Sequence, residues 1–432
     1  MKGTFRMTLG TLAASLVAVP VSAGLTLERC QELARANYPL LRQYCIVRQA
    51  AAFTVENIER GWLPQVGVSG QASLQSDVAT LPDALTQMLA AGGYDVKGLE
   101  KDQYRVGVDV SQLVWDGGAL SARRDEAERE ADVQTAQTDV DMYAVRERVD
   151  QLFFGVLLLD DRLLLNDELQ RLLQDNCRKL EAMVEGGTAM AADAEAVRAE
   201  WLTARQQRTE LLAMRKSYRQ MLAIFIGRDT AQVADLERPA PVLPQTSEPD
   251  ARPEMRLFAA QEARTDARRR SLDAALKPTF SAFAQGYYGY PGYDMFGDMF
   301  SHDWTLNGVI GVRLTWNLSR FYTHKNERRQ LELEKSAIAT ARDVFRFNTS
   351  LQTAQETADI ARYRRLMDED DDIIRLRTSV RQAAEARLQH GVIDVNTLLQ
   401  EISRENTARL NRSSHEIELL RAISELKHTI NQ

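Results

Sequence analysis

The most constraining feature of this sequence is a stretch that it contains twice. The first copy is residues 106–118, VGVDVSQLVWDGG, and the second is residues 310–322, IGVRLTWNLSRFY. Each copy begins with apolar and polar side chains in alternation, the pattern of a β-strand with one apolar and one polar face. Each then runs directly into a very long helical pattern. The chain therefore contains two half-polar strands that each lead into a long helix.

The stretch after the first strand, residues 119–185, is predicted to be one continuous helix. Asp116-Gly117-Gly118 marks the turn into it. Its apolar side chains follow alternating steps of four and three residues, interrupted only by Asn166 and Gln170, which indicates a coiled-coil seam. The seam consists of Val145, Val149, Leu152, Val156, Leu159, Leu163, Leu173, Cys177, Leu180 and Val184. At ~1.5 Å per residue such a helix is ~100 Å long, more than a single globular domain needs.

The rest of the chain repeats this plan. The predicted order is a helix over 25–60, a strand over 66–74, a loop over 75–103, a strand over 104–114, helices over 119–185 and 190–226, a proline-rich connector over 227–252 and, in the second half, a strand over 279–288. The spacing of Pro39 and Pro64 recurs in Pro253 and Pro278 at an offset of 214. The offset falls to 204 for Gly187 and Gly391, so the first half carries ten more residues between its two strands. A loop joining strands tolerates such an insertion.

Four strands are too few for a closed barrel, which needs about eight. A sheet with open edges is forbidden inside a bilayer, because its unpaired backbone groups have no partner there. We therefore expect an oligomer in which several chains contribute four strands each to one barrel.

Residues 1–23 are predicted to be a cleaved export signal. Lys2 and Arg6 form the positive start, residues 7–19 an apolar core, and Val21-Ser22-Ala23 a cleavage site of small residues. No later stretch approaches the ~20 consecutive apolar residues of a membrane-spanning helix. The net charge of -7 gives no support to nucleic-acid binding, which requires a concentrated basic surface.

The chain resembles the outer membrane efflux protein family, the TolC-like channels. The resemblance covers essentially the whole chain after the signal, and the order and duplication of its motifs make it specific. The motifs are LTLERCQELARANYPLL at 25–41, GWLPQVGVSG at 61–70, VGVDVSQLVWDGG at 106–118 and the two glycine-centred turns at Gly187 and Gly391.

The resemblance implies a mainly α-helical fold with a β-barrel portion. Three chains would form a twelve-stranded barrel in the outer membrane and a twelve-helix barrel through the periplasm. Residues 24–238 would be the first structural repeat, 239–252 an equatorial connector and 253–432 the second repeat. The implied function is the channel of a tripartite efflux or type I secretion system, exporting small molecules or proteins. The implied partners are a periplasmic adaptor, an inner-membrane transporter of RND, ABC or MFS type, and outer-membrane lipid.

In a channel, the two sets of strand side chains would face different surroundings. The set expected to face lipid is Val106, Val108, Val110, Ile310, Val312, Leu314 and Trp316. The set expected to face a water-filled lumen is Asp109, Ser111, Arg313 and Thr315. A soluble β-sandwich has the same alternation, but the flanking helices leave no second sheet for it to pack against. The aromatic loop over 287–304 is placed at the outer end, as an interfacial belt or as a loop that packs on itself.

The resemblance also implies a periplasmic gate where the helices after Gly187 and Gly391 converge. In the family, aspartates form a ring there, and the sequence offers Asp193, Asp394, Thr397 and Gln400. Asp193 fits the family pattern, whereas Thr397 and Gln400 stand where its best-known members have aspartates. The alternative role for Asp193 and Asp394 is helix N-capping, and capping is compatible with lining a pore.

The sequence favours no catalytic or cofactor-binding site. The five histidines have no metal-ligand spacing, and no phosphate loop or nucleophile motif is present. Cys30 and Cys45 are predicted to share one helix at a separation too large for a disulfide, and the cysteines are predicted to be buried small apolar residues. Two alternative functions remain open at this point: a soluble periplasmic coiled-coil scaffold, and a secreted hydrolase that uses scattered carboxylates.

Overall fold

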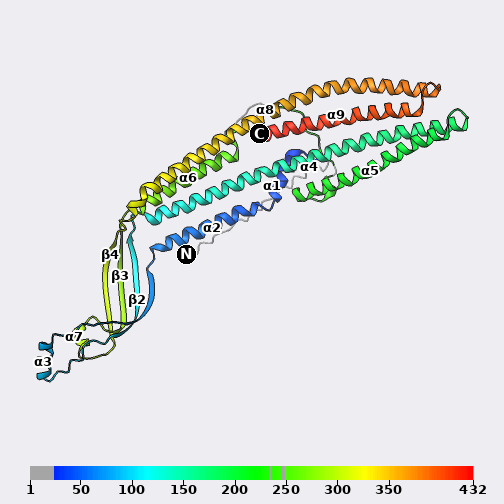
Figure 1. The fold of residues 1–432 in the computed structure, drawn as a ribbon. Coiled ribbons are helices and arrows are strands. Elements are labelled where there is room, and N and C mark those ends of the chain that lie inside the picture. Colours follow the sequence, from blue (N-terminus) through cyan, green and yellow to red (C-terminus); the bar gives the residue numbers. More distant parts are fainter. Residues whose placement is uncertain (1–23, 234, 245–248, 432) are drawn as a thin grey trace, which may run out of the picture.

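A computed structural model describes residues 24–233, 235–244 and 249–431, so the predicted export signal over 1–23 lies outside the described residues. The molecule is elongated (Figure 1). Helices form a long arm, a β-sheet continues from one end of the arm, and the connections with two short helices lie at the outer end of the sheet. At the opposite end, called the tip below, each pair of long helices is joined by a turn. Among the described residues, no helix is long and apolar enough to cross a membrane.

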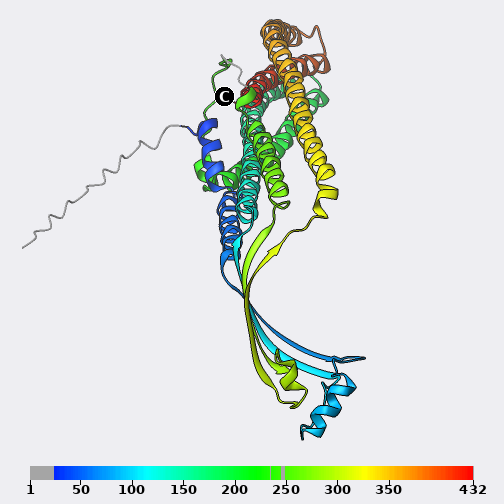
Figure 2. The same cartoon turned by 90° about the vertical axis from the view of Figure 1, so that its left-hand side faces the viewer.

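The described residues contain one antiparallel four-stranded sheet in the order β1-β2-β3-β4. Its strands are β1 (Gln65–Leu74), β2 (Asp102–Trp115), β3 (Thr279–Tyr290) and β4 (Thr305–Thr315). The main helices are α1 (Leu27–Asn37), α2 (Leu41–Glu59), α4 (Ala119–Glu185), α5 (Ala191–Ile226), α6 (Pro253–Ala274), α8 (Arg320–Gln389) and α9 (Val395–Thr429). The sheet twists and bends strongly away from the arm (Figure 2).

Each strand is continuous with one line of helices along the arm, which we call a column. The four columns lie side by side in the same order as the four strands. Along the chain, α2 leads into β1, β2 into α4, α6 into β3, and β4 into α8. The helix α4 packs against α2 and α5 and also against α6 and α9, whereas α8 packs against α6 and α9 (Figure 1). The helix α5 thus extends the column of α2 toward the tip, and α9 extends the column of α6.

The helix α4 is continuous over 67 residues, and the predicted seam lies in its C-terminal part. Most members of the seam are buried, among them Val149, Val156 and Leu180. The interrupting residue Asn166 is also buried, and its side-chain amide donates to the carbonyl of Ala204 on α5 at 3.0 Å. The polar residue in the seam is therefore hydrogen-bonded, as a buried amide must be.

Two contacts join neighbouring columns where the helices meet the sheet. Lys277 Nζ, just before β3, donates to the carbonyl of Gly117 at the start of α4 at 2.9 Å. Trp316 Nε1, just after β4, donates to the carbonyl of Leu276 at 2.9 Å. We call these two contacts the junction. The side chain of Asp116 caps α4 from the same place, accepting from the backbone N–H of Leu120 at 2.6 Å.

The prediction of one helix over 25–60 is wrong. The chain forms α1 and α2, separated at residues 38–40, because Pro39 disfavours the helical conformation of the residue before it. Tyr38 is accordingly extended, with ψ 129°. Cys30 and Cys45 consequently lie on different helices, so the expectation that they share one is also wrong. All three cysteines are free, but only Cys30 is buried as expected, whereas Cys45 is exposed and Cys177 is partly exposed.

The connection over 75–103 is not only a loop, because it contains the short helix α3 (Asp83–Ala91). The strand β4 begins earlier than its alternating pattern indicated, and it ends at Thr315, before Trp316. The ladder stops at the pair Thr279 and Thr315, because Pro278, the residue just before β3, has no N–H to donate. Trp316 therefore belongs to the junction and not to the strand.

Candidate functional site

The register of the sheet brings the two predicted sets of side chains onto opposite faces. Val108 lies opposite Val68 on β1 and opposite Gly286 on β3, and Ala284 lies opposite both Val110 and Ile310. Directly paired residues share a face, so most of the apolar residues of the four strands form one surface. Its members are Val66, Val68, Ala72, Leu74, Val106, Val108, Val110, Phe280, Ala282, Ala284, Tyr288, Leu306, Ile310, Val312 and Leu314.

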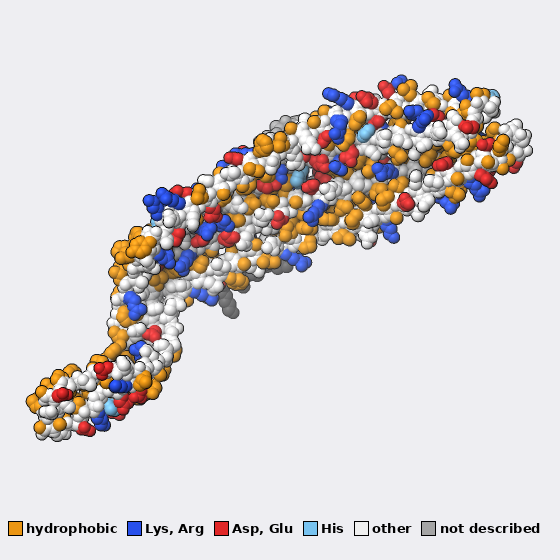
Figure 3. Space-filling model, viewed as in Figure 1, with side chains coloured by type: hydrophobic (Ala, Val, Ile, Leu, Met, Phe, Trp, Pro, Cys, Tyr) orange, Lys and Arg blue, Asp and Glu red, His pale blue; other side chains and the backbone are white. Residues whose placement is uncertain are grey.

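This apolar face is uncovered. Ile310 and Leu306 each expose 83% of their surface, and Val312 exposes 74%. In Figure 3, apolar side chains also gather at the outer end, near α3, and where the sheet joins the helices. A continuous exposed apolar face of this kind marks contact with a membrane or another protein.

The opposite face is mainly polar, with Leu113, Phe283 and Val309 as apolar members. It carries the predicted residues Asp109, Ser111, Arg313 and Thr315, together with residues that the sequence pattern did not single out. These are Gln65, Ser69, Gln71, Ser73, Arg105, Ser281, Gln285, Tyr287 and Asn307. Ser69 Oγ donates to the Asp109 carboxylate at 3.1 Å, and the Arg313 guanidinium lies 4.7 Å from the centre of the Phe283 ring.

Both lateral edges of the molecule lack a partner in the single chain. The strands β1 and β4 each have a neighbour on one side only. The helices that continue these edges, α2 and α8, expose large apolar side chains. On α2 these include Phe53, which is 65% exposed, and on α8 they include Phe347 and Leu351.

The tip is formed by two turns of the same geometry. Gly187 and Gly391 have φ angles of +71° and +69°, a conformation that favours glycine. After each glycine the backbone bonds back to the helix, from Thr188 N to Met183 O at 2.8 Å and from Val392 N to Arg387 O at 2.9 Å. The predicted hairpin turns are therefore built alike in the two halves.

Both predicted gate aspartates cap helices at the tip. Asp394 is the N-cap of α9, and its carboxylate accepts from the backbone N–H of Thr397 at 2.9 Å and from its hydroxyl at 2.5 Å. These hydrogen bonds lower the pKa of Asp394. Asp193 accepts from the backbone N–H of Met190 at 3.1 Å. Gln400 is exposed one turn beyond Thr397.

The two hairpins share an apolar core near the tip. Val197 on α5 and Leu398 on α9 are fully buried in it, against Leu180 of α4 and Ala384 of α8. Polar contacts also cross between the hairpins there. Arg409 on α9 pairs with Glu168 on α4 at 3.4 Å, and Asn176 on α4 donates to Glu385 on α8 at 3.5 Å.

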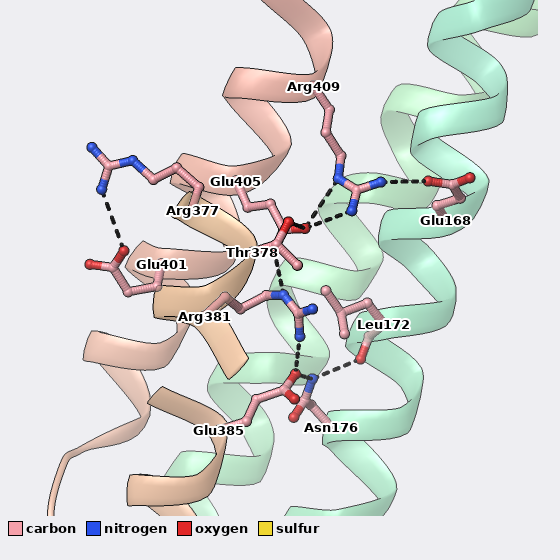
Figure 4. Close-up of polar contacts among 10 residues, drawn as sticks. All are labelled: Glu168, Leu172, Asn176, Arg377, Thr378, Arg381, Glu385, Glu401, Glu405 and Arg409. Atoms are coloured by element: carbon pink, nitrogen blue, oxygen red, sulfur yellow. Dashed lines mark hydrogen bonds and ion pairs between the residues drawn. The ribbon is translucent and has the colours of Figure 1, made fainter. Parts of the chain in front are cut away.

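Glu405 on α9 is the centre of this polar network (Figure 4). Its buried carboxylate accepts from Arg381, from Thr378 at 2.8 Å and from Arg409 at 2.7 Å. Burial alone would raise the pKa of Glu405, but these three donors outweigh it and leave the pKa below its ordinary value. The sequence did not reveal this network, although Arg381 with Glu385 and Glu405 with Arg409 form pairs spaced by four residues on the two helices.

A second buried carboxylate lies in the middle of the arm. Asp150 on α4 accepts from Gln31 on α1 at 2.5 Å and from Ser424 on α9 at 2.6 Å. Burial raises the pKa of Asp150 to about 6, against the lowering effect of these hydrogen bonds. Among the described residues, no group of three or more His, Cys, Asp or Glu side chains is placed to hold a metal ion.

The family model described as outer membrane efflux protein matches residues 31–228, from α1 to the end of α5. No curated protein sequence matches the chain. The predicted resemblance is confirmed by the family match and by similar solved structures.

Three solved structures illustrate the shared fold. The outer membrane protein VceC from Vibrio cholerae is 12% identical, with a TM-score of 0.67 over 94% of this chain and 95% of that one. The CmeC outer membrane channel of Campylobacter jejuni is 13% identical, with a TM-score of 0.64 over 99% and 94%. The open state of the MtrE outer membrane channel of Neisseria gonorrhoeae is 15% identical, with a TM-score of 0.64 over 94% and 88%.

Proposed function

We propose that this chain, a TolC-like member of the outer membrane efflux protein family, forms a trimeric channel of a tripartite efflux or type I secretion system. The observation that carries the proposal is the four-stranded sheet, which has one exposed apolar face, one polar face and two open edges. An open edge inside a bilayer leaves backbone N–H and C=O groups without partners. Pairing β4 of one copy with β1 of the next removes every edge, and three copies give twelve strands.

The helices support the same closure. Because the helical columns follow the order of the strands, pairing β1 with β4 also brings α2 and α5 of one copy beside α8 of the next. The exposed apolar side chains on α2 and α8, such as Phe53 and Phe347, would then be covered. The result is a helical barrel continuous with the strand barrel.

In this assembly the apolar face contacts outer-membrane lipid and the polar face lines the lumen. The tip, with Asp193, Asp394, Thr397 and Gln400, lies in the periplasm and forms the gate. The proposed partners at that end are a periplasmic adaptor and an inner-membrane transporter of RND, ABC or MFS type. The exported cargo is small molecules or proteins. The hydrolase alternative has no support from the matched family or from these structural neighbours, none of which is described as an enzyme.

Fractionation and mass measurement test the proposal together. The mature chain is expected in the outer-membrane fraction, with the mass of a trimer in mild detergent, and is expected to conduct ions across a planar bilayer. A monomer in mild detergent, or recovery of the chain in the periplasmic supernatant, would favour the soluble scaffold and overturn the channel.

A further inference from the structure

The polar face of the sheet has a recess at its outer end that the channel proposal does not use. Its volume is about 400 Å³, within the range of small-molecule binding sites. Polar-face residues of three strands form its floor, and the connection between β3 and β4 forms one wall. We call it the outer-mouth recess and define it by Gln71, Gln103, Arg105, Tyr287, Tyr293 and Met295.

The wall of the recess is fixed in place over the polar face. The backbone N–H of Tyr293 donates to the side-chain oxygen of Asn307 on β4 at 2.7 Å. The Tyr287 hydroxyl donates to the carbonyl of Pro291 at 3.2 Å, and the Tyr287 and Tyr293 rings meet edge to face at 5.4 Å. Within the connection, the buried Asp298 carboxylate accepts from the backbone N–H of Gly292 at 2.6 Å. The recess is therefore preformed, which reduces the ordering cost of binding.

The recess is lined by positive charge only. Arg105 is the single charged side chain in its lining, and no carboxylate lines it. The nearest acid on the same face of β2, Asp109, is four residues away and is hydrogen-bonded by Ser69. Arg105 donates to the side-chain oxygen of Gln71, which occupies only part of a guanidinium with five N–H donors. The remaining donors suit a carboxylate, which a guanidinium binds with two parallel hydrogen bonds.

We propose that the outer-mouth recess binds planar aromatic carboxylates. The carboxylate pairs with Arg105, and the ring packs on Tyr287 and Tyr293, since aromatic pairs prefer offset or edge-to-face contact. The proposal rests on the channel function for one point only, that the polar face lines the lumen. A trimer then has three such recesses around its outer mouth.

Calorimetric titration of the full chain in detergent with benzoate tests the proposal. Saturable binding at one site per chain is expected. Arg105→Gln should weaken it about tenfold, the loss expected for a charge-assisted hydrogen bond, and Arg105→Lys should weaken it less. Arg313→Gln is the matched control, because Arg313 lies on the same face near the inner end of β4, and it should leave the affinity unchanged.

Three outcomes would overturn the proposal: no saturable binding of benzoate, an Arg105→Gln chain that binds as tightly as the original, or an equal loss in Arg105→Gln and Arg313→Gln. Benzyl alcohol, which keeps the ring without the charge, should bind more weakly than benzoate. Trimer mass in detergent verifies that each variant assembles. Since the titration needs no conduction, binding without bilayer conductance would reject the channel, and conductance without binding would reject the recess.

Discussion

The Asp150 carboxylate on α4 accepts a hydrogen bond from Ser424 on α9 at 2.6 Å, which joins two helices through residues 274 positions apart in the chain. Gln31 on α1 bonds the other carboxylate oxygen, so one acid holds three helices together in the middle of the arm. Arg146, Glu425, Glu28 and His428 also surround this position.

The first prediction concerns pH. Because burial raises the pKa of Asp150 to about 6, the folded state binds this proton more tightly than the unfolded chain does. The contribution of Asp150 to the free energy of unfolding therefore rises as the pH falls from about 6 toward the pKa of this group in the unfolded chain. The rise is up to about 3 kcal/mol. Asp150→Asn should remove that rise without lowering the melting temperature at pH 7. Melting curves from pH 4.5 to 8 measure it, with the exposed Asp368→Asn as control. A variant that keeps the full pH dependence would assign it to another group.

The second prediction concerns the Glu405 network. Glu405→Gln leaves Arg381 and Arg409 without their shared buried carboxylate, which should cost roughly 3 kcal/mol of unfolding free energy. Glu418→Gln removes a partly exposed pair with Arg421 at 3.5 Å and should cost less than about 1 kcal/mol. Because the pKa of Glu405 is lowered, its contribution is present at neutral pH and lost as pH falls through the lowered value. Equal melting temperatures for the two variants at pH 7 would contradict the prediction.

The third prediction concerns the strand faces. Val312→Arg places a charge on the apolar face and should cost roughly 2–4 kcal/mol if that face contacts the middle of the bilayer. Arg313→Val changes the next residue, on the polar face, and should lose only the contact with Phe283, worth about 1 kcal/mol. The yield of trimer in the outer-membrane fraction compares them. Failure of Arg313→Val with normal assembly of Val312→Arg would reverse the assignment of the faces.

The fourth prediction concerns the tip. Three copies of Asp193 and Asp394 around one axis should attract cations, and with Thr397 and Gln400 in place of acids the preference should be modest. We expect the resting channel to be closed at this end. Asparagine also caps helices, so Asp193→Asn with Asp394→Asn removes charge while keeping both caps. Reversal potentials in planar bilayers should move toward zero in the double variant, and trimers should still form. Unchanged cation selectivity would leave both residues as caps alone.

The features that repeat along the chain were predictable from sequence. The alternation over 106–110 and 310–314 predicted which side chains share a face of the sheet, and the seam from Val145 to Val184 predicted the long helix. Both predictions were possible because the two-residue repeat of a strand and the four-three repeat of a helix follow directly from which side chains are buried. The equal geometry of the turns followed from Gly187 and Gly391.

Features that depend on contacts between distant residues were not predictable. The sequence gives no sign that Asp150 meets Gln31 and Ser424, because a buried acid resembles a surface acid until its partners are known. The helix α3 was missed because its short pattern has no buried face to set a period, and all nine of its residues are at least partly exposed. The break at Pro39 was missed although proline allows it, since the helical pattern continues on both sides.

Because the junction lies at one end of the arm, a small rotation there moves the tip by a large distance. Lys277 and Trp316 tie the three columns of β2, β3 and β4 together where helices become strands, so the sheet is held at the point about which the helices would turn. With ~100 Å of helix beyond it, a rotation of about 5° at the junction displaces the tip by about 9 Å. A displacement of that size needs no change in strand register. In the proposed channel, partners that act on the helices alone would therefore open the tip without changing the pairing of the barrel strands.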